Sequence, residues 1–562
     1  MKIIQKIVRK EIKFGWLVKI VIYILLISLN SGRIFSNNDI FRNPQDIQFS
    51  HAQNLDNKLF QELVQADDEC LDIAKSSLLI AKEVNAEINV KDYLECIDWY
   101  ARMIKSRIQD NDGPETIVNI INDFLFNELG FTYVKTGNLE DLYLNDVIDR
   151  RKGNCVGMSI LYLSIVERLQ LPLFGVNVPE HIFIRYDDGE TKINIETGHK
   201  GINLNDSFYI THSMERFDKT SIENGCYLRN LSKTEVIANI FLNRSKISRT
   251  SGNLKEALND CNISILLKPE DPGTYCNRGV IYEKMGMITE AINDYGRAIT
   301  LNHKYASAYY NRGSAFGVVD EIDKAIEDFN KAISINPEFK LSYYNRAIAF
   351  KRIGQTEKAI QDYNKVIDID PDFAQAYCNR GVTFAETGRF DDAINDFNKA
   401  IELNPNHSDA YFARAIFFAD IKELKKAIED FGKCIELSPD KTFAYYLRGK
   451  AYKEIGKIDK AIQDFNKAIT IRPYYAGLYV DRGIILFQAG RLDEAITDFD
   501  KSLELFPKNP IAYRYRGELF KKKGLFKKAI EDFESFLEIV PDSHDSKIIR
   551  NEILKLKKLR TN

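Results

Sequence analysis

An arginine that recurs every 34 residues constrains this 562-residue chain more than any other feature of its sequence. The arginine appears nine times without a slip, and a small residue follows each copy. The nine copies are Arg244, Arg278, Arg312, Arg346, Arg380, Arg414, Arg448, Arg482 and Arg516. A fixed period of this length is typical of repeat architectures, in which each unit buries its apolar face against its neighbours. The sequence therefore predicts nine repeats over residues 238–543.

Two further positions that recur every 34 residues indicate what each repeat contains. An alanine stands thirteen residues after each arginine, as Ala257 and Ala291 do, and a proline closes eight of the nine repeats, with His303 as the exception. Small residues let two helices approach closely, and proline ends a helix because it lacks a backbone N–H. Each repeat is therefore expected to be a pair of antiparallel helices.

An aspartate follows each arginine by sixteen residues, as in Arg244 with Asp260 and Arg278 with Asp294. We predict a salt bridge inside every repeat. A feature present in all nine copies serves the stacking of repeats better than the recognition of one ligand. A row of ligand-binding arginines is the alternative interpretation.

These columns, seen in 306-ASAYYNRGSAFGVVDEIDKAIEDFNKAISINPEF-339, resemble the tetratricopeptide repeat. The resemblance implies an all-α superhelical solenoid whose concave groove binds a protein or peptide ligand. The fifth residue of each first helix would face this groove, where aromatic rings suit an extended peptide or a helix. The aromatic candidates are Tyr310, Tyr344, Phe412 and Tyr446. The alternative is that these rings only fill space between helices.

The two ends of the chain differ from the repeats. Residues 1–35 begin with five lysines and arginines and continue with 16-WLVKIVIYILLISL-29, which predicts either a signal peptide or an uncleaved membrane anchor. Either interpretation makes the protein exported or membrane-anchored, with the bulk of the chain extracytoplasmic and the membrane a partner only if the segment is uncleaved. Residues 544–562 place apolar residues at helical spacing among lysines, as expected of a cap helix.

Charge and cysteine usage exclude several classes of partner. Lys+Arg 78 against Asp+Glu 81 gives a net charge of −3, so no broad positive field is available for nucleic acid. The eight cysteines include no C-x-x-C pair, which argues against a zinc site or a compact disulfide framework. Neither a cofactor nor a metal is expected. A metal site of His181, Glu196 and His199 is a distant alternative, because the histidine spacing matches no familiar ligand pattern.

The segment before the repeats contains one cysteine in a chemically distinctive position. Helices are predicted over 71–84, 91–108 and 114–131, and in 150-RRKGNCVGMSILYLSIVERLQLP-172 apolar residues recur at helical spacing after Gly153-Asn154. Cys155 is therefore expected at a helix start, where unpaired backbone N–H groups and the helix dipole favour a thiolate. The alternative is that Cys155 is a small buried apolar residue.

A histidine and a glutamate bracket the next predicted feature, 181-HIFIRYDDGETKINIE-196. If Asp188-Gly189 forms a two-residue hairpin turn, His181 lies directly opposite Glu196 and the Ile182/Ile195 and Ile184/Ile193 pairs form. The carboxylate could then orient one imidazole nitrogen while the other faces a nucleophile. The same register places Arg185 opposite Lys192, a mildly unfavourable pair.

A cysteine at a helix start, followed by a histidine and an acidic residue on the next strands, resembles the transglutaminase-like branch of papain-like thiol enzymes. The resemblance rests on 153-GNCVGMSILYLSIVERLQLPLFGVNVPEHIFIRY-186. It implies an α+β domain, placed here at 55–215 and joined to the repeats by a linker at 216–237. It also implies that Cys155 is the nucleophile, His181 the general base and acid, and Glu196 the residue that orients the imidazole. Glu180 departs from the small residue more usual before the histidine.

Two functions from different classes follow from this organisation. The first is a thiol-dependent acyl-transfer enzyme, a protease, amidase or acyltransferase if active, whose repeats present a protein substrate or partner. The second is a non-catalytic, membrane-associated scaffold for protein–protein interaction, in which replacing Cys155 would leave function intact.

Overall fold

The protein is described by a computed structural model that covers residues 68–135, 138–213, 215, 217, 219–223 and 225–561. The predicted leader, residues 1–35, lies outside these ranges. No helix within them is both long and apolar enough to cross a membrane. The described residues fall into two compact units, 68–354 and 355–561, which are considered separately.

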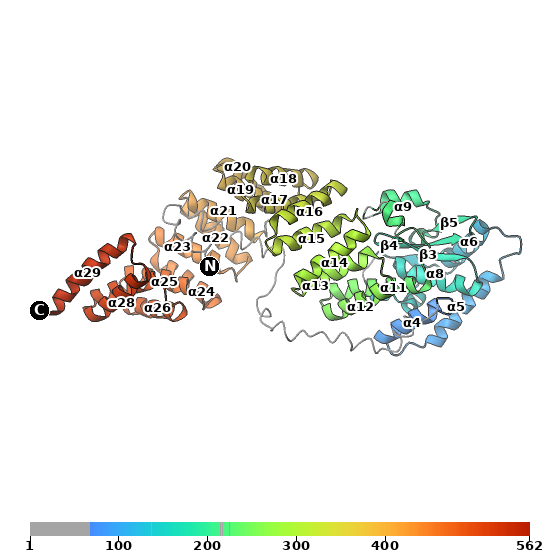
Figure 1. The fold of residues 1–562 in the computed structure, drawn as a ribbon, viewed down its shortest axis with the longest axis horizontal. Coiled ribbons are helices and arrows are strands. Elements are labelled where there is room, and N and C mark those ends of the chain that lie inside the picture. Colours follow the sequence, from blue (N-terminus) through green and yellow to red (C-terminus); the bar gives the residue numbers. More distant parts are fainter. Residues whose placement is uncertain are drawn as a thin grey trace. The chain divides into compact units, whose positions relative to one another are not determined.

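The first unit begins with three helices, two of which pack against one long buried helix (Figure 1). The two are α4 (Ile73–Val84) and α5 (Val90–Lys105). The third is α6 (Pro114–Asn122), which continues as a π-helical segment, Asp123–Glu128. The three helices predicted from the sequence are thus confirmed. Pro114 stands at the first turn of α6, where its missing N–H costs nothing.

Helix α8 (Cys155–Leu169) lies at the centre of this domain. Every residue from Val156 to Val166 is buried, because the helix packs on α4 and α5 on one side and on the sheet on the other. Shorter elements complete the region before and after it. They are β1 (Thr132–Tyr133), the 3-10 turn Leu139–Asp141, α7 (Leu144–Arg150), β2 (Lys152–Gly153), the 3-10 turn Thr197–His199, α9 (Asp206–His212) and α10 (Lys219–Glu223).

The sheet has three antiparallel strands in the order β3 (Leu173–Val178), β4 (His181–Asp187) and β5 (Lys192–Ile195). Ile182, Ile184 and Ile195 join the core that α8 builds. β3 has no counterpart among the sequence predictions. The strand does not show the alternation of polar and apolar residues that would predict it, because nearly every residue is buried on both faces of the sheet.

The predicted register of the β4–β5 hairpin is wrong. Ile184 faces Ile195 and Asp187 faces Lys192, so the loop spans four residues, from Asp188 to Thr191, and not two. The Asp188 carboxylate causes this, because it accepts hydrogen bonds from the backbone N–H groups of Glu190 (3.0 Å) and Thr191 (2.7 Å). The shift is two residues, so every side chain keeps the face that the sequence predicts.

The shift also removes the unfavourable Arg185/Lys192 pair. Arg185 faces Asn194 and donates to its side-chain oxygen at 2.8 Å, while Lys192 forms an ion pair with Asp187. The Arg185 guanidinium, buried at 2% exposure, also donates to Asp206 at the start of α9. This contact fixes α9 against the sheet.

After α11, the helices of the repeats are alternately 14 and 13 residues long. This regular succession is what the 34-residue period predicts (Figure 1). In the first unit they are α11 (Lys233–Thr250), α12 (Leu254–Leu267), α13 (Pro272–Lys284), α14 (Ile288–Leu301), α15 (Ala306–Val318), α16 (Ile322–Ile335) and α17 (Lys340–Arg352). In the second unit they are α18 (Thr356–Ile369), α19 (Ala374–Glu386), α20 (Phe390–Leu403), α21 (Ser408–Asp420), α22 (Leu424–Leu437), α23 (Thr442–Glu454), α24 (Ile458–Ile471), α25 (Ala476–Gln488), α26 (Leu492–Leu505), α27 (Pro510–Lys522) and α28 (Phe526–Ile539), followed by α29 (His544–Thr561).

Eight of the predicted arginine–aspartate salt bridges are confirmed, with the aspartate side chains almost fully buried. In one of them, Arg414 donates from Nε to Asp430 at 2.7 Å and from a terminal nitrogen at 2.8 Å. Its remaining nitrogen donates to Asn398 of the preceding repeat at 2.6 Å. The arginine therefore joins the second helices of two consecutive repeats, which explains why it recurs in every copy. The others are Arg244–Asp260, Arg278–Asp294, Arg312–Asp328, Arg380–Asp396, Arg448–Asp464, Arg482–Asp498 and Arg516–Asp532.

Candidate thiol site

Cys155 is the first residue of α8, as the sequence predicts. The Asn154 side chain caps the helix, its oxygen accepting from the backbone N–H groups of Val156 (3.0 Å) and Gly157 (2.9 Å). No described residue accepts a hydrogen bond from the Cys155 backbone N–H. This N–H is therefore free to stabilise an oxyanion that forms beside the sulfur.

A close backbone approach fixes the start of α8. A Cβ at Gly157 would stand 2.5 Å from the carbonyl oxygen of Asp141, which also accepts from the Asn154 backbone N–H at 2.8 Å. Only glycine fits at this position without moving the backbone. The turn before α8 thereby holds Cys155 in place.

His181 contacts Glu196 and lines the same pocket as Cys155, although it is not paired with Glu196 in the sheet. Its Nε2 atom lies 2.7 Å from Glu196 Oε2, and Cys155 is near enough to affect the pKa of the ring. Since Nε2 faces the carboxylate, Nδ1 is the nitrogen that remains to act on the sulfur. The structure thus places the three predicted residues at one site.

The charges of this group favour an ion pair. Burial would lower the pKa of His181, but the neighbouring side chains of Cys155 and Glu196 raise that pKa to about 10. Burial likewise opposes ionisation of Glu196, yet hydrogen bonds from His181, the Gly198 backbone N–H and Tyr209 keep its pKa below the ordinary value. The imidazolium and the carboxylate are therefore the prevailing forms at neutral pH.

Tyr209 is a member of the site that sequence reasoning missed. Its hydroxyl donates to Glu196 Oε2 at 3.1 Å, and its ring stacks on Phe183 with 4.1 Å between centroids. Tyr209 lies on α9, which the Arg185–Asp206 contact holds against the sheet. No local pattern in 205-NDSFYITH-212 distinguishes this tyrosine, so only the tertiary contact reveals it.

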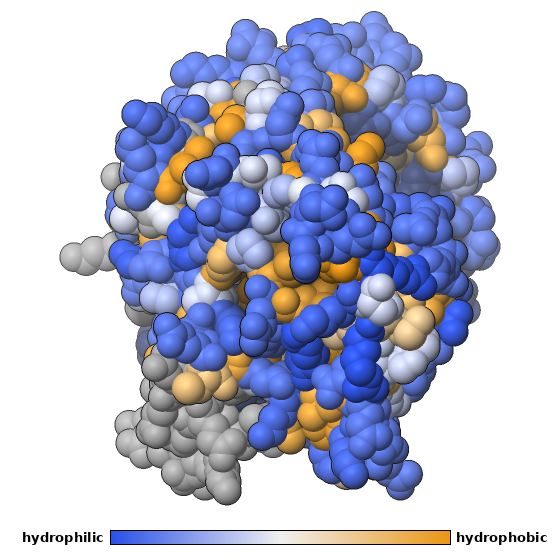
Figure 2. Space-filling model, turned by 90° about the vertical axis from the view of Figure 1, so that its right-hand side faces the viewer, coloured by the Kyte–Doolittle hydropathy of each residue, from blue (hydrophilic) through white to orange (hydrophobic). Residues whose placement is uncertain are grey.

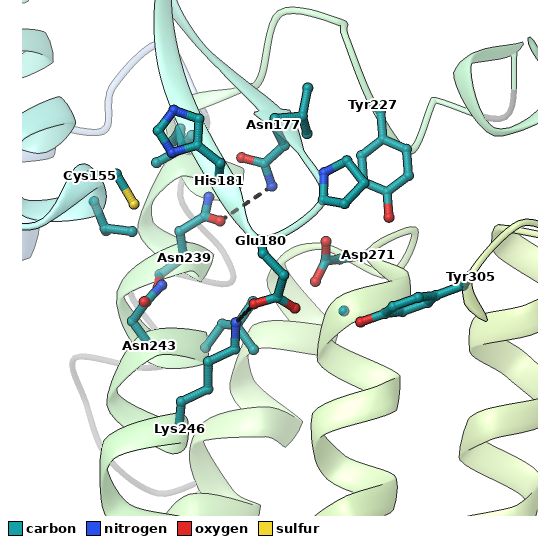
Figure 3. Close-up of a pocket in the computed structure, with 16 residues that line it drawn as sticks. Cys155, Asn177, Glu180, His181, Tyr227, Asn239, Asn243, Lys246, Asp271 and Tyr305 are labelled. Atoms are coloured by element: carbon teal, nitrogen blue, oxygen red, sulfur yellow. Dashed lines mark hydrogen bonds and ion pairs between the residues drawn. The ribbon is translucent and has the colours of Figure 1, made fainter. Parts of the chain in front are cut away.

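A small polar pocket lies beside Cys155 and His181 (Figure 3). One side comes from β3, β4 and the turn between them, with Asn177 and Glu180. The other comes from the first repeats, where Asn239, Asn243 and Lys246 project from α11 and Tyr305 precedes α15. The cavity volume is about 40 Å³, which holds about three water molecules. Without the side chains of the first repeats, this pocket would be open on one side.

The predicted groove aromatics are engaged within the array. Asn345 donates to the Tyr310 hydroxyl at 3.2 Å, Tyr446 donates to Asp481 at 2.7 Å, and Phe412 is only 3% exposed. Tyr344 is half-buried. These contacts favour the alternative that the rings fill space between helices, and a role in ligand binding stays a prediction.

Metal-ligating groups do not gather in the described part of the chain. Within it, no three histidine, cysteine, aspartate or glutamate side chains are placed to hold a metal ion. His199, the third member of the alternative metal site, ends a 3-10 turn and is exposed. All eight cysteines are free thiols, and Cys261 and Cys434 are fully buried in the repeats.

Comparison with known protein families agrees with this architecture. Residues 91–240 match the transglutaminase-like superfamily. Tetratricopeptide repeat families match 272–305, 306–339, 374–407 and 442–475, and further repeat families match 329–361, 351–388, 397–429 and 483–524. The protein is therefore a fusion of a transglutaminase-like domain with tetratricopeptide repeats, and the predicted α+β domain followed by all-α repeats is confirmed.

Similar proteins cover only parts of the chain. A UPF0162 protein of Xylella fastidiosa is 29% identical over 139 residues, which are 23% of this chain and 48% of the relative. A UPF0162 protein of Pasteurella multocida is 29% identical over 191 residues, covering 31% and 67% of the two chains. Human F-box only protein 21 is 26% identical over 196 residues, covering 32% and 28%. The chain thus spans about half the length of the Xylella relative.

Solved structures that are similar also cover only part of the chain. A crystal structure of MamA matches with a TM-score of 0.28 and 30% identity, covering 29% of this chain and 94% of MamA. A tetratricopeptide repeat protein from Parabacteroides merdae matches with a TM-score of 0.36 and 22% identity, covering 44% and 98%.

Proposed function

We propose that this protein is a thiol-dependent acyl-transfer enzyme that acts on an amide of a protein or peptide. The observation that carries the proposal is the position of His181, which contacts Glu196 through Nε2 and lines the same pocket as Cys155. This order of nucleophile, base and orienting acid is what cysteine nucleophiles require. The free N–H of Cys155 supplies an oxyanion donor.

The reaction divides into two steps. The Cys155 thiolate attacks the amide carbonyl carbon, the C–N bond breaks, and the His181 imidazolium gives its proton to the departing amine. Water or a second amine then attacks the thioester, and His181 takes a proton from the attacking group as the sulfur leaves. Glu196 stays ionised throughout and holds the ring in the orientation that both steps need.

In this proposal the repeats bring a protein or peptide to the site. Helix α11 belongs both to the first repeat and to the wall of the pocket, so a ligand held along the first repeats would approach Cys155. Residues 1–35 would place the enzyme at or beyond a membrane, as a signal peptide or an anchor. Separating cell fractions of cells that produce the full chain, with and without residues 1–35, tests this placement.

The first experiment is the pH dependence of iodoacetamide alkylation at Cys155, followed by mass spectrometry. We expect Cys155 to react well below about pH 8.5, where an ordinary thiol ionises, and His181→Ala to remove this advantage. Cys434, which is fully buried in the repeats, serves as the internal control. A Cys155 that titrates as an ordinary thiol in both proteins would contradict the proposal.

A non-catalytic scaffold is the second candidate, favoured by the large share of the chain that the repeats occupy. In that case Cys155→Ala would leave every cellular function of the protein intact. Substitution of groove positions such as Tyr310 or Phe412 would abolish those functions. Complementation of a deletion strain with the two kinds of variant separates the candidates.

A further inference from the structure

The turn that delivers His181 has an unusual backbone. Val178 pairs with His181, so Pro179 and Glu180 alone connect β3 to β4. Glu180 has a φ of +61°, in the left-handed region that residues with a Cβ disfavour and glycine adopts readily. A glutamate at this position therefore needs a compensating interaction.

The Glu180 side chain supplies that interaction by crossing to the first repeat (Figure 3). Its carboxylate forms an ion pair with Lys246 of α11, and Tyr305, which precedes α15, lines the same pocket. The side chains of Glu180 and Lys246 are 32% and 28% exposed, so solvent screens the pair in part. The positive charge of Lys246 is also the main reason that the pKa of Glu180 is below its ordinary value.

Helix α11 is itself anchored to the transglutaminase-like domain at two places, both before Lys246 in the sequence. Near its start, the backbone N–H groups of Lys233 and Thr234 donate to Asp68 at 3.0 and 2.9 Å. One helical turn or more further on, Asn177 of β3 donates to Asn239 at 3.3 Å. Lys246 therefore holds Glu180 from a helix whose position is fixed, and not from a loose side chain on the surface.

We propose that Lys246 is a positioning residue for the thiol site, which fixes the left-handed Glu180 turn and thereby holds His181 against Cys155 and Glu196. The first tetratricopeptide repeat then takes part in building the site. This inference rests on the proposed function only for its consequence in catalysis. The positioning itself concerns His181 and is measurable without any substrate.

A purely electrostatic role for Lys246 predicts a change of the opposite sign. The groups that face His181 are Cys155 of α8, Glu196 after β5 and Tyr209 of α9, with Glu180, Lys246 and Asp271 around the pocket. Removing the Lys246 cation would, by its charge alone, raise the pKa of His181. Releasing the turn would lower that pKa, because His181 would lose its contacts with Cys155 and Glu196.

The test is a titration of His181 by NMR in the full chain labelled with 13C-histidine. The chain has seven histidines, and His181→Gln assigns the signal. We expect Lys246→Met to lower the pKa of His181 by about one unit and to slow Cys155 alkylation at pH 7 by about tenfold. Lys246→Arg should retain the wild-type value, because it keeps the cation.

Two further variants separate positioning from loss of fold. The double variant Glu180→Gly/Lys246→Met should recover most of the wild-type pKa, since glycine adopts the left-handed turn unaided and leaves no unpaired carboxylate. Lys255→Met, which removes an exposed lysine from α12, is the matched control and should change nothing. Recovery in the double variant would also show that Lys246→Met still folds.

An unchanged or raised His181 pKa in Lys246→Met would overturn the inference. The two proposals also fail separately. If the pKa of His181 responds as expected while Cys155 reacts as an ordinary thiol, the positioning stands and the acyl-transfer function falls. If Cys155 is reactive and its reactivity is the same in Lys246→Met as in the wild type, the proposed function stands and the positioning role of Lys246 is wrong.

Discussion

Glu196 Oε2 accepts hydrogen bonds from His181 Nε2 at 2.7 Å and from the Tyr209 hydroxyl at 3.1 Å, so one buried oxygen holds two members of the site. The residue itself is 3% exposed. An acceptor in this position is costly to bury unless its donors stay in place. The behaviour of His181 and Tyr209 therefore depends on the same carboxylate, which leads to the first three predictions.

Glu196→Gln should lower the pKa of His181 and slow Cys155 alkylation at neutral pH. The neutral amide keeps the size of the side chain but removes the charge that stabilises the imidazolium. NMR titration and alkylation kinetics measure the two effects. Glu190→Gln, in the exposed hairpin loop, is the matched control, and an equal effect of both substitutions would contradict a specific role for Glu196.

Tyr209→Phe should destabilise the domain by about 1.5–3 kcal/mol, the usual cost of losing a hydrogen bond to a charged group. The ring stacked on Phe183 remains, so the packing survives and the effect isolates the hydroxyl. Thermal unfolding measures the loss. Tyr186→Phe removes a hydroxyl that donates to Asp188 at 3.2 Å beside the exposed loop and should have a smaller effect.

The contribution of His181 to stability should depend on pH with a definite sign. Its pKa is raised from 6.5 to about 10 on folding, so the stabilisation is fully present below about pH 6.5 and disappears as the pH rises through 10. The difference in melting temperature between wild type and His181→Gln should therefore shrink from pH 6.5 to pH 10. A difference that grows over this range would contradict the ion pair.

Arg414→Met should destabilise the array by about 3 kcal/mol, because it leaves Asp430 buried without its partner. Arg414→Met/Asp430→Leu should recover most of this loss, since an apolar pair needs no partner for a buried charge. Urea unfolding and hydrogen exchange across α21 and α22 measure both variants. Arg491→Met breaks an exposed pair with Glu494 and should cost nothing measurable.

Exposed apolar side chains give no comparable basis for a prediction. The large ones in the first unit include Trp99, Ile202, Phe208 and Ile210. The face of the molecule in Figure 2 is mainly hydrophilic, with apolar patches between hydrophilic side chains. Scattered residues of this kind are normal on protein surfaces.

The sequence by itself determined those features of the fold that depend on the spacing of residues close together along the chain. The 34-residue period predicts the helix pairs and the arginine–aspartate bridges, because residues sixteen apart lie on the two helices of one repeat. The break at Gly153-Asn154 likewise places Cys155 at the start of α8. The sequence also predicts that His181 and Glu196 are neighbours, although by a wrong register, and the family resemblance adds Cys155 to them.

Only the tertiary structure decided the remaining features, because they depend on contacts between distant segments. The Asp188 side chain lengthened the hairpin loop, and Glu196 still reaches His181 because a shift of two residues preserves the face of each strand. Tyr209 enters the site from α9, and Lys246 enters from the first repeat. The spacing of residue types along the sequence does not predict such contacts. They form between elements whose packing is fixed only when the whole domain folds.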